Sequence, residues 1–196
     1  MRDARGATGR NLETGEVEPD KVKQAGCWLG AVGYMIMFDQ VGTSYRPLST
    51  VAIQGATFTR ALEYFVPEVS EPEREALYAL RCSFVHDFSL INVGKGANQQ
   101  LRELRTHHFI LDDAEQSGPV VRLPLHRWDG ELAHCRKGNA TWVNLRSLGD
   151  LAETVFKRLI ALQEKGELTI ALTGGLLELQ RRYAMTIYPG LHMQES

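Results

Sequence analysis

The stretch SEPEREALYALRCSFVHDFSLINVG, residues 70–94, carries the strongest helix signal in the chain. Ser70 is a good N-cap, Glu73 completes a capping box three residues later, and Pro72 suits the first turn. Apolar residues then recur at steps of three and four, the spacing of one buried helical face: Leu77, Leu80, Phe84, Phe88 and Ile91. We therefore expect an amphipathic helix here, ended by Asn92 and Gly94, around which the rest of the chain packs.

The opposite side of this helix is semi-polar and carries an arginine and a histidine. Tyr78, Cys82, Ser89 and His86 gather there, and Arg81 lies at the boundary. Arg81 and His86 are five positions apart, which turns them about 140° from each other around an α-helix. The two side chains meet only through the length of the arginine, through a local distortion, or in a cleft shared with another helix.

Four further segments have helical patterns and boundary residues. Gly42 suits the end of the first, Pro67 follows the second, and Ser147 caps the third with Asp150 as its partner. The expected helices cover residues 19–41, 50–65, 147–165 and 176–185.

The first of these segments is rich in glycine and in large apolar residues. Gly26, Gly30 and Gly33 each lower helix propensity by about 1 kcal/mol relative to alanine. We expect them to allow close approach by a neighbouring helix. The large apolar residues are expected in the core: Trp28, Met35 and Met37.

The hydrophobic pattern changes from helical to strand-like over residues 107–145. HHFILDD (107–113) and PVVRLPLHRW (119–128) are apolar runs around a Gly-containing loop, which predicts a β-hairpin, and a short strand is expected at 141–145. The predicted fold class is therefore mainly α, a helical bundle with a small β-hairpin insertion at about 107–145. One domain is expected over 19–196, after a flexible N-terminal tail over 1–18.

Composition narrows the class of protein. Among 196 residues, 43% are hydrophobic and 23% charged, as in a globular protein with a core, and the net charge of −2 gives no overall attraction to nucleic acid. Three widely spaced cysteines argue against a disulfide framework and for a reducing compartment. The longest charge-free run, 24–38, is too short to span a membrane, and no secretion signal is apparent. We expect a cytoplasmic protein.

The other histidines and cysteines give weaker evidence for a metal site or a catalytic site. His107 and His108 point to opposite faces of any strand, and His126, His134 and Cys135 lack the spacing of metal ligands. We therefore expect neither a metal nor a cofactor. Two other Arg–His spacings match that of Arg81 and His86, but neither falls in a capped amphipathic helix: Arg102 with His107 or His108, and Arg127 with His134.

The segment LYALRCSFVHDF (77–88) resembles the Arg-x(4–6)-His signature of the HEPN superfamily. These are small helical-bundle proteins that include many metal-independent RNases of prokaryotic toxin and defence systems. The resemblance implies that Arg81 and His86 are the catalytic pair and that two subunits join their motifs in a homodimer. It differs at Cys82, where active members often carry a polar Asn, Asp or His, and in the hairpin-like segment.

The residue types suit RNA cleavage without a metal. The 2′-OH of the ribose attacks the phosphate, His86 transfers protons, and the Arg81 guanidinium stabilises the charge on the phosphorane. Tyr78, Ser83 and Asp87 are candidates to orient the pair or to contact the ribose.

Two alternatives remain open. One is a non-catalytic HEPN-like module that binds RNA, a nucleotide or a cognate protein partner in a toxin–antitoxin or defence locus. The other is an unrelated α+β protein in which Arg81 and His86 are incidental.

Overall fold

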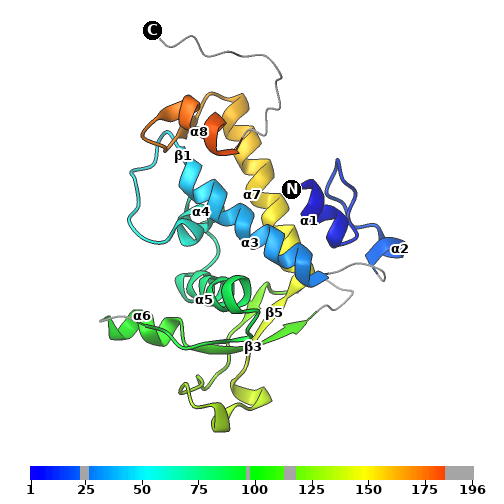
Figure 1. The fold of residues 1–196 in the computed structure, drawn as a ribbon, viewed down its shortest axis with the longest axis vertical. Coiled ribbons are helices and arrows are strands. Elements are labelled where there is room, and N and C mark those ends of the chain that lie inside the picture. The colour runs from blue at the N-terminus through cyan, green and yellow to red at the C-terminus, as the bar shows by residue number, and fades with distance from the viewer. Residues whose placement is uncertain (23–26, 96–97, 113–117, 184–196) are drawn as a thin grey trace.

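The computed structural model describes residues 1–22, 27–95, 98–112 and 118–183, and Figure 1 shows their arrangement. Most helices surround the long α3 and α7, while α5 lies between them and a four-stranded sheet. The helices are α1 (Arg2–Ala7), α2 (Pro19–Val22), α3 (Cys27–Ser44), α4 (Thr57–Phe65), α5 (Glu71–Asp87), α6 (Gln99–Leu104), α7 (Leu145–Glu164) and α8 (Gly175–Tyr183). The strands are β1 (Tyr45–Pro47), β2 (Ile91–Asn92), β3 (His107–Asp112), β4 (Val121–Arg122), β5 (Thr141–Asn144) and β6 (Leu168–Ile170).

The fold is mixed α/β, so the prediction of a mainly α helical bundle with a small hairpin insertion is wrong. One sheet pairs β1 with β6, and the other has the strand order β2-β3-β5-β4. The second sheet begins with β2, outside the expected insertion at 107–145. The strand predicted at 141–145 is confirmed as β5.

The predicted hairpin is wrong because β5 lies between its two expected strands. β3 and β5 run parallel, with Leu111 opposite Val143, and β4 pairs with the other edge of β5. A parallel pair needs a long connection, which the chain between β3 and β5 supplies. Apolar alternation identifies a strand but does not identify its neighbour, so two runs on either side of a short loop resemble a hairpin.

The central helix begins as predicted and ends one turn early. The Glu73 carboxylate accepts the Ser70 backbone N–H at 2.9 Å, as in a capping box. Phe88 then takes a left-handed conformation, with φ of 51°, which ends α5 and turns the chain toward β2. Ile91, expected on the helical stripe, pairs instead with His108 of β3.

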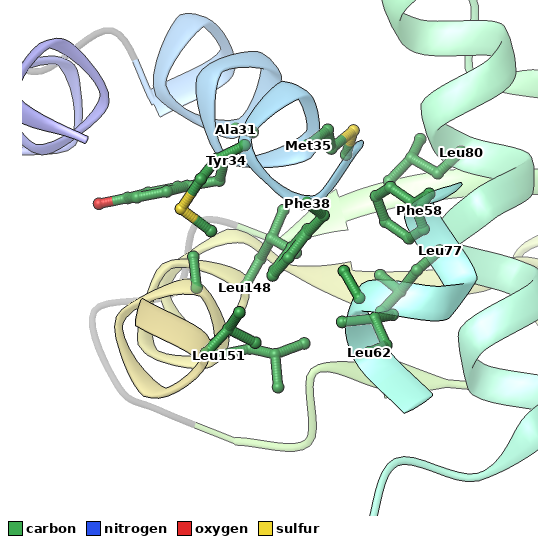
Figure 2. Close-up of a cluster of buried hydrophobic side chains, with 14 of the residues drawn as sticks. Ala31, Tyr34, Met35, Phe38, Phe58, Leu62, Leu77, Leu80, Leu148 and Leu151 are labelled. Carbon is green, nitrogen blue, oxygen red and sulfur yellow. The ribbon is translucent and has the colours of Figure 1, made fainter. Parts of the chain in front are cut away.

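The core forms around α3, which packs against α1, α4, α5 and α7. Figure 2 shows Phe38 of α3 at its centre, between Leu148 of α7 and Phe58 of α4. The predictions for Met35 and Met37 are confirmed, since both are buried, whereas Trp28 is 49% exposed.

Glycines set the distance between α3 and its neighbours, as expected. A Cβ on Gly30 would lie 2.2 Å from Cγ2 of Thr8, and one on Gly33 would lie 3.0 Å from Cβ of Ala4. Gly26 lies outside the described residues. Gly42 does not end the helix: α3 continues to Ser44, and Gly42 packs against the start of α4.

Residues 1–18 are folded, in contrast to the flexible tail that their polar composition suggested. Nε and Nη2 of Arg5 donate to Glu153 of α7 at 2.8 and 2.7 Å, and Nη2 of Arg10 contacts Asp150 at 2.8 Å. Both arginines are buried. Their acidic partners lie about 140 positions away in the chain, so the local sequence gives no sign of them.

The boundaries of the other helices differ from those predicted from the sequence. The helix expected over 19–41 contains α2 and most of α3, with residues 23–26 outside the described chain, and that over 50–65 begins only at Thr57. α7 begins before the expected Ser147, because Asn144 is its N-cap and accepts the Ser147 N–H at 2.8 Å. α8 agrees with the helix predicted from 176, within the described residues. In the described part of the chain, no helix is long and apolar enough to cross a lipid bilayer.

Candidate active site

Arg81 and His86 meet near the C-terminal end of α5. Nη1 of Arg81 lies 2.8 Å from Nε2 of His86, so the length of the arginine bridges the angle between the two positions. A guanidinium only donates hydrogen bonds, so Nε2 of His86 is the acceptor in this contact. The contact places the imidazole lone pair against a cation, so Nε2 becomes free only when the guanidinium takes another partner.

A carboxylate on α3 holds the arginine from its other side. Oδ2 of Asp39 lies 2.5 Å from Nε of Arg81, and Oδ1 accepts the Thr57 hydroxyl at 2.7 Å. Partial burial lowers the pKa of Arg81, but the charge and hydrogen bond of Asp39 outweigh it and raise that pKa above its ordinary value. A connected series of contacts therefore runs from Thr57 on α4 through α3 to the Arg81–His86 pair on α5.

Asp39 was missed in the sequence, although a signal existed. It is the only charged residue in α3, and it directly follows the charge-free run 24–38. A lone carboxylate on an apolar helix needs a partner when the helix packs. That partner is Arg81, which is 22% exposed against 20% for Asp39.

The three residues expected to support the pair, Tyr78, Ser83 and Asp87, differ in burial and in the direction of their side chains. Tyr78 is half-buried, and the Arg105 guanidinium stacks on its ring at 4.4 Å. Burial, followed by the neighbouring Cys82 thiol, raises the pKa of Tyr78. Ser83 is buried and donates to the Ala79 carbonyl at 3.2 Å, so it points away from the pair. Asp87 is exposed, and its carboxylate has no hydrogen bond or ion pair to another described residue.

An apolar surface adjoins the pair. It comprises Trp28, Leu29, Ile36 and Phe88, which are between 49% and 69% exposed and which we call the α3–α5 face. Phe84 links its parts, with ring centroids 5.2 Å from Trp28 and 6.3 Å from Phe88. Phe88 follows His86 by two residues, and Ile36 precedes Asp39 by one helical turn.

The other histidines have separate roles. His107 is buried, with its ring nitrogens 2.8 Å from the Thr141 hydroxyl and from the Leu104 carbonyl, and burial lowers its pKa to about 4. His108 bonds Asn139 at 2.7 Å, and His134 pairs with Asp129 at 2.6 Å. Of the three Arg–His spacings in the sequence, only Arg81 and His86 form a hydrogen bond within the described residues. The same residues contain no group of three or more His, Cys, Asp or Glu positioned to hold a metal ion.

Two surface hollows lie away from the pair. One, of about 500 Å³, is lined by residues that include Arg102, Glu103, Arg127 and Asp129, and its charges are mixed. The other, of about 670 Å³, lies against β4 and β5. Arg81 and His86 line neither of these two hollows; His86 is exposed and Arg81 is partly buried.

A scan against protein-family models and searches of curated proteins and of solved structures found no match to this chain.

Proposed function

We propose that this protein is a metal-independent endoribonuclease in which Arg81 and His86 carry the chemistry. The observation that carries the proposal is the 2.8 Å contact between the two side chains, with Arg81 held by Asp39. The local resemblance of residues 77–88 to the HEPN signature supports the same assignment. We place the protein in the cytoplasm of a prokaryote, in a toxin or defence system; the free thiols of Cys82 and Cys135 are in keeping with a reducing compartment.

The proposed reaction is a transesterification within the RNA. When the phosphate binds, the Arg81 guanidinium moves from Nε2 of His86 to the non-bridging oxygens and frees the imidazole lone pair. Nε2 of His86 then takes the proton of the 2′-OH, the 2′-oxygen forms a bond to phosphorus, and the bond from phosphorus to the 5′-oxygen breaks. A protonated imidazole returns a proton to the leaving oxygen. Arg81 stabilises the non-bridging oxygens as charge builds on them. The products are a 2′,3′-cyclic phosphate and a 5′-OH, and no water or metal takes part.

We propose further that the protein acts as a homodimer joined through the α3–α5 face. Exposed apolar residues on this face cluster beside the pair, and such a patch marks an interaction surface in a globular protein. A two-fold contact there would bring two His86 side chains toward one RNA, so that one acts as base and the other as acid.

A second candidate function is favoured by Asp39. Its carboxylate occupies one edge of the guanidinium and adds a negative charge close to where a phosphate would bind. This arrangement suits a non-catalytic module in which Arg81 and His86 help to bind RNA, a nucleotide or a cognate protein.

Cleavage of mixed RNA in EDTA tests the proposal. We expect the purified protein to leave 2′,3′-cyclic phosphate ends, and the His86→Ala variant to lose at least 10²-fold in rate, the usual contribution of a general acid–base group. The matched control is His126→Ala, which removes an exposed imidazole outside the site.

The chemistry of the RNA ends and the activities of the variants distinguish the enzyme from the binding module. Loss of activity in Arg81→Lys as well as His86→Ala supports the assigned roles, because lysine keeps the charge but not the planar fork. If the folded protein leaves RNA intact, the binding module replaces the enzyme. If cleavage persists in His86→Ala, the assignment of His86 is wrong.

A further inference from the structure

The four-stranded sheet has one covered face and one open face. Successive residues of a strand point to opposite faces. Phe109, Val121 and Val143 point toward α5 and are buried in the core. Their neighbours in β4 and β5, Arg122 and Trp142, are paired across the strands and point the other way. Arg122 is exposed and Trp142 is half-buried, so this outer face presents an aromatic ring beside a cation.

The outer face is hollowed around Trp142. The hollow of about 670 Å³ is lined by β4, the chain that follows it, and the 3₁₀ turn η2 (Lys137–Asn139). Figure 1 shows the segment between β4 and β5 on the far side of the sheet from α5. We call this the Trp142 hollow and define it by Arg122, Leu123, Pro124, Lys137, Gly138 and Trp142.

Two cations converge on the ring. Cζ of Arg122 lies 4.9 Å from the centroid of the Trp142 ring, and Nζ of Lys137 lies 5.3 Å from it. The interaction of a cation with an indole face is favourable, and these two contacts hold the Arg122 and Lys137 side chains above the hollow.

Among the residues that the structure describes, no carboxylate neutralises the charge of these two cations. Six arginines elsewhere form ion pairs with carboxylates: Arg5, Arg10, Arg81, Arg105, Arg158 and Arg182. Within the described residues, neither Arg122 nor Lys137 has such a partner, and no acidic residue lines the hollow. A chain with a net charge of −2 therefore keeps a local site of two positive charges around an aromatic ring.

We infer that the Trp142 hollow binds single-stranded nucleic acid. A phosphate between Arg122 and Lys137 supplies the missing counter-charge, and an unpaired base stacks on Trp142 in place of one of the cations. Cations that follow the backbone and an aromatic ring that stacks a base are the two components of single-strand binding sites. The inference does not rest on the proposed cleavage, because this binding requires neither Arg81 nor His86.

Fluorescence anisotropy with a labelled 2′-O-methyl RNA strand tests the inference. This probe lacks the attacking hydroxyl, so binding is measured even if the protein cleaves RNA. We expect Arg122→Gln and Lys137→Gln each to reduce the slope of log affinity against log salt by about 0.7, the value for one phosphate contact on a single strand. We expect Trp142→Leu to weaken binding about tenfold or more.

Gly138 allows a test that leaves the ring and both cations in place. A Cβ there meets no atom within 4 Å, so a larger side chain fits without displacing a neighbour. Gly138→Glu should weaken binding severalfold by placing a carboxylate in the hollow, while the uncharged Gly138→Gln should stay close to the unmodified protein. Thermal melting of each variant confirms that it is folded.

The competing outcomes are distinct. If the Arg122, Lys137 and Gly138 variants bind with unchanged affinity and salt slope, the hollow is not the binding site. If inorganic polyphosphate competes as well as RNA and Trp142→Leu has no effect, the site is a general anion site and the inference of a nucleic-acid ligand is overturned.

Discussion

At the scale of single residues, Asp39 has two opposing effects on the proposed reaction. It fixes the guanidinium of Arg81 beside His86, and it places a negative charge near the incoming phosphate. Asp39 is therefore a positioning residue rather than a catalytic one. Removing its charge while keeping its shape should affect substrate binding and turnover in different directions.

We expect Asp39→Asn to lower kcat about tenfold, because a loosened arginine meets the phosphorane in fewer productive orientations. KM should fall, because one negative charge near the RNA is lost. Steady-state cleavage of a short RNA substrate measures both, with Asp20→Asn as the control for the same change at an exposed site. If Asp39→Asn lowers the free energy of unfolding, and kcat falls only because less of the protein is folded, the role of Asp39 is purely structural.

The candidate pair could be selected from the sequence, but its geometry could not. Arg81 and His86 stood out because they lie on a capped helix, and the structure brings them together. Their separation by about 140° argued against contact, since helical spacing ignores the reach of a long side chain. Ser83 illustrates the converse. It neighbours the pair in sequence, but its position on the helix turns it toward the core.

At the scale of secondary-structure elements, the α3–α5 face carries the proposal of a homodimer. We expect Leu29→Glu or Ile36→Glu to convert the dimer to a monomer, because a charge would be buried without a partner. Sedimentation velocity measures the mass, and the cleavage rate should fall with it. The control is Leu125→Glu, a residue that is 91% exposed and outside this face.

The oligomeric state decides between the outcomes. A single mass for all three variants and the unmodified protein would remove the α3–α5 face as an interface. A monomer that cleaves RNA at the full rate would keep the chemistry but exclude a role for the second subunit.

Elements with local signals were predicted better than those that depend on distant partners. The capping box of α5 lies within four residues, and the strand at β5 has its own apolar pattern. The sheet order β2-β3-β5-β4 depends on pairing between strands far apart, for which periodicity carries no information. The fold class was wrong for this reason, since β2 was assigned to a helix and β4 to a hairpin.

At the scale of the whole molecule, the buried His107 links stability to pH. Its pKa is lowered to about 4 by burial, against an ordinary value of 6.5. Between these values the unfolded chain binds a proton that the folded protein excludes, so the free energy of unfolding decreases as pH falls from about 6.5 to 4. The full effect is on the order of 3 kcal/mol.

Urea denaturation across this pH range measures the effect. We expect His107→Gln to be less stable at neutral pH but to lose less stability on acidification than the unmodified protein. His126→Gln, at an exposed position, should keep the unmodified slope. A parallel loss in the His107 variant and the unmodified protein would show that other groups account for the acid sensitivity.

The buried contacts between the N-terminal segment and α7 have a consequence for the time course of synthesis. Arg5 cannot form its ion pair until Glu153 has been synthesised, 148 residues later. At about 5–20 residues per second, the ribosome leaves α1 without its partner for roughly 7–30 s. During that time α1 can pack on α3, but its contacts to α7 are missing. The first helix to leave the ribosome is thus among the last to complete its contacts, and until α7 is made the buried side chains of Arg5 and Arg10 lack their carboxylate partners.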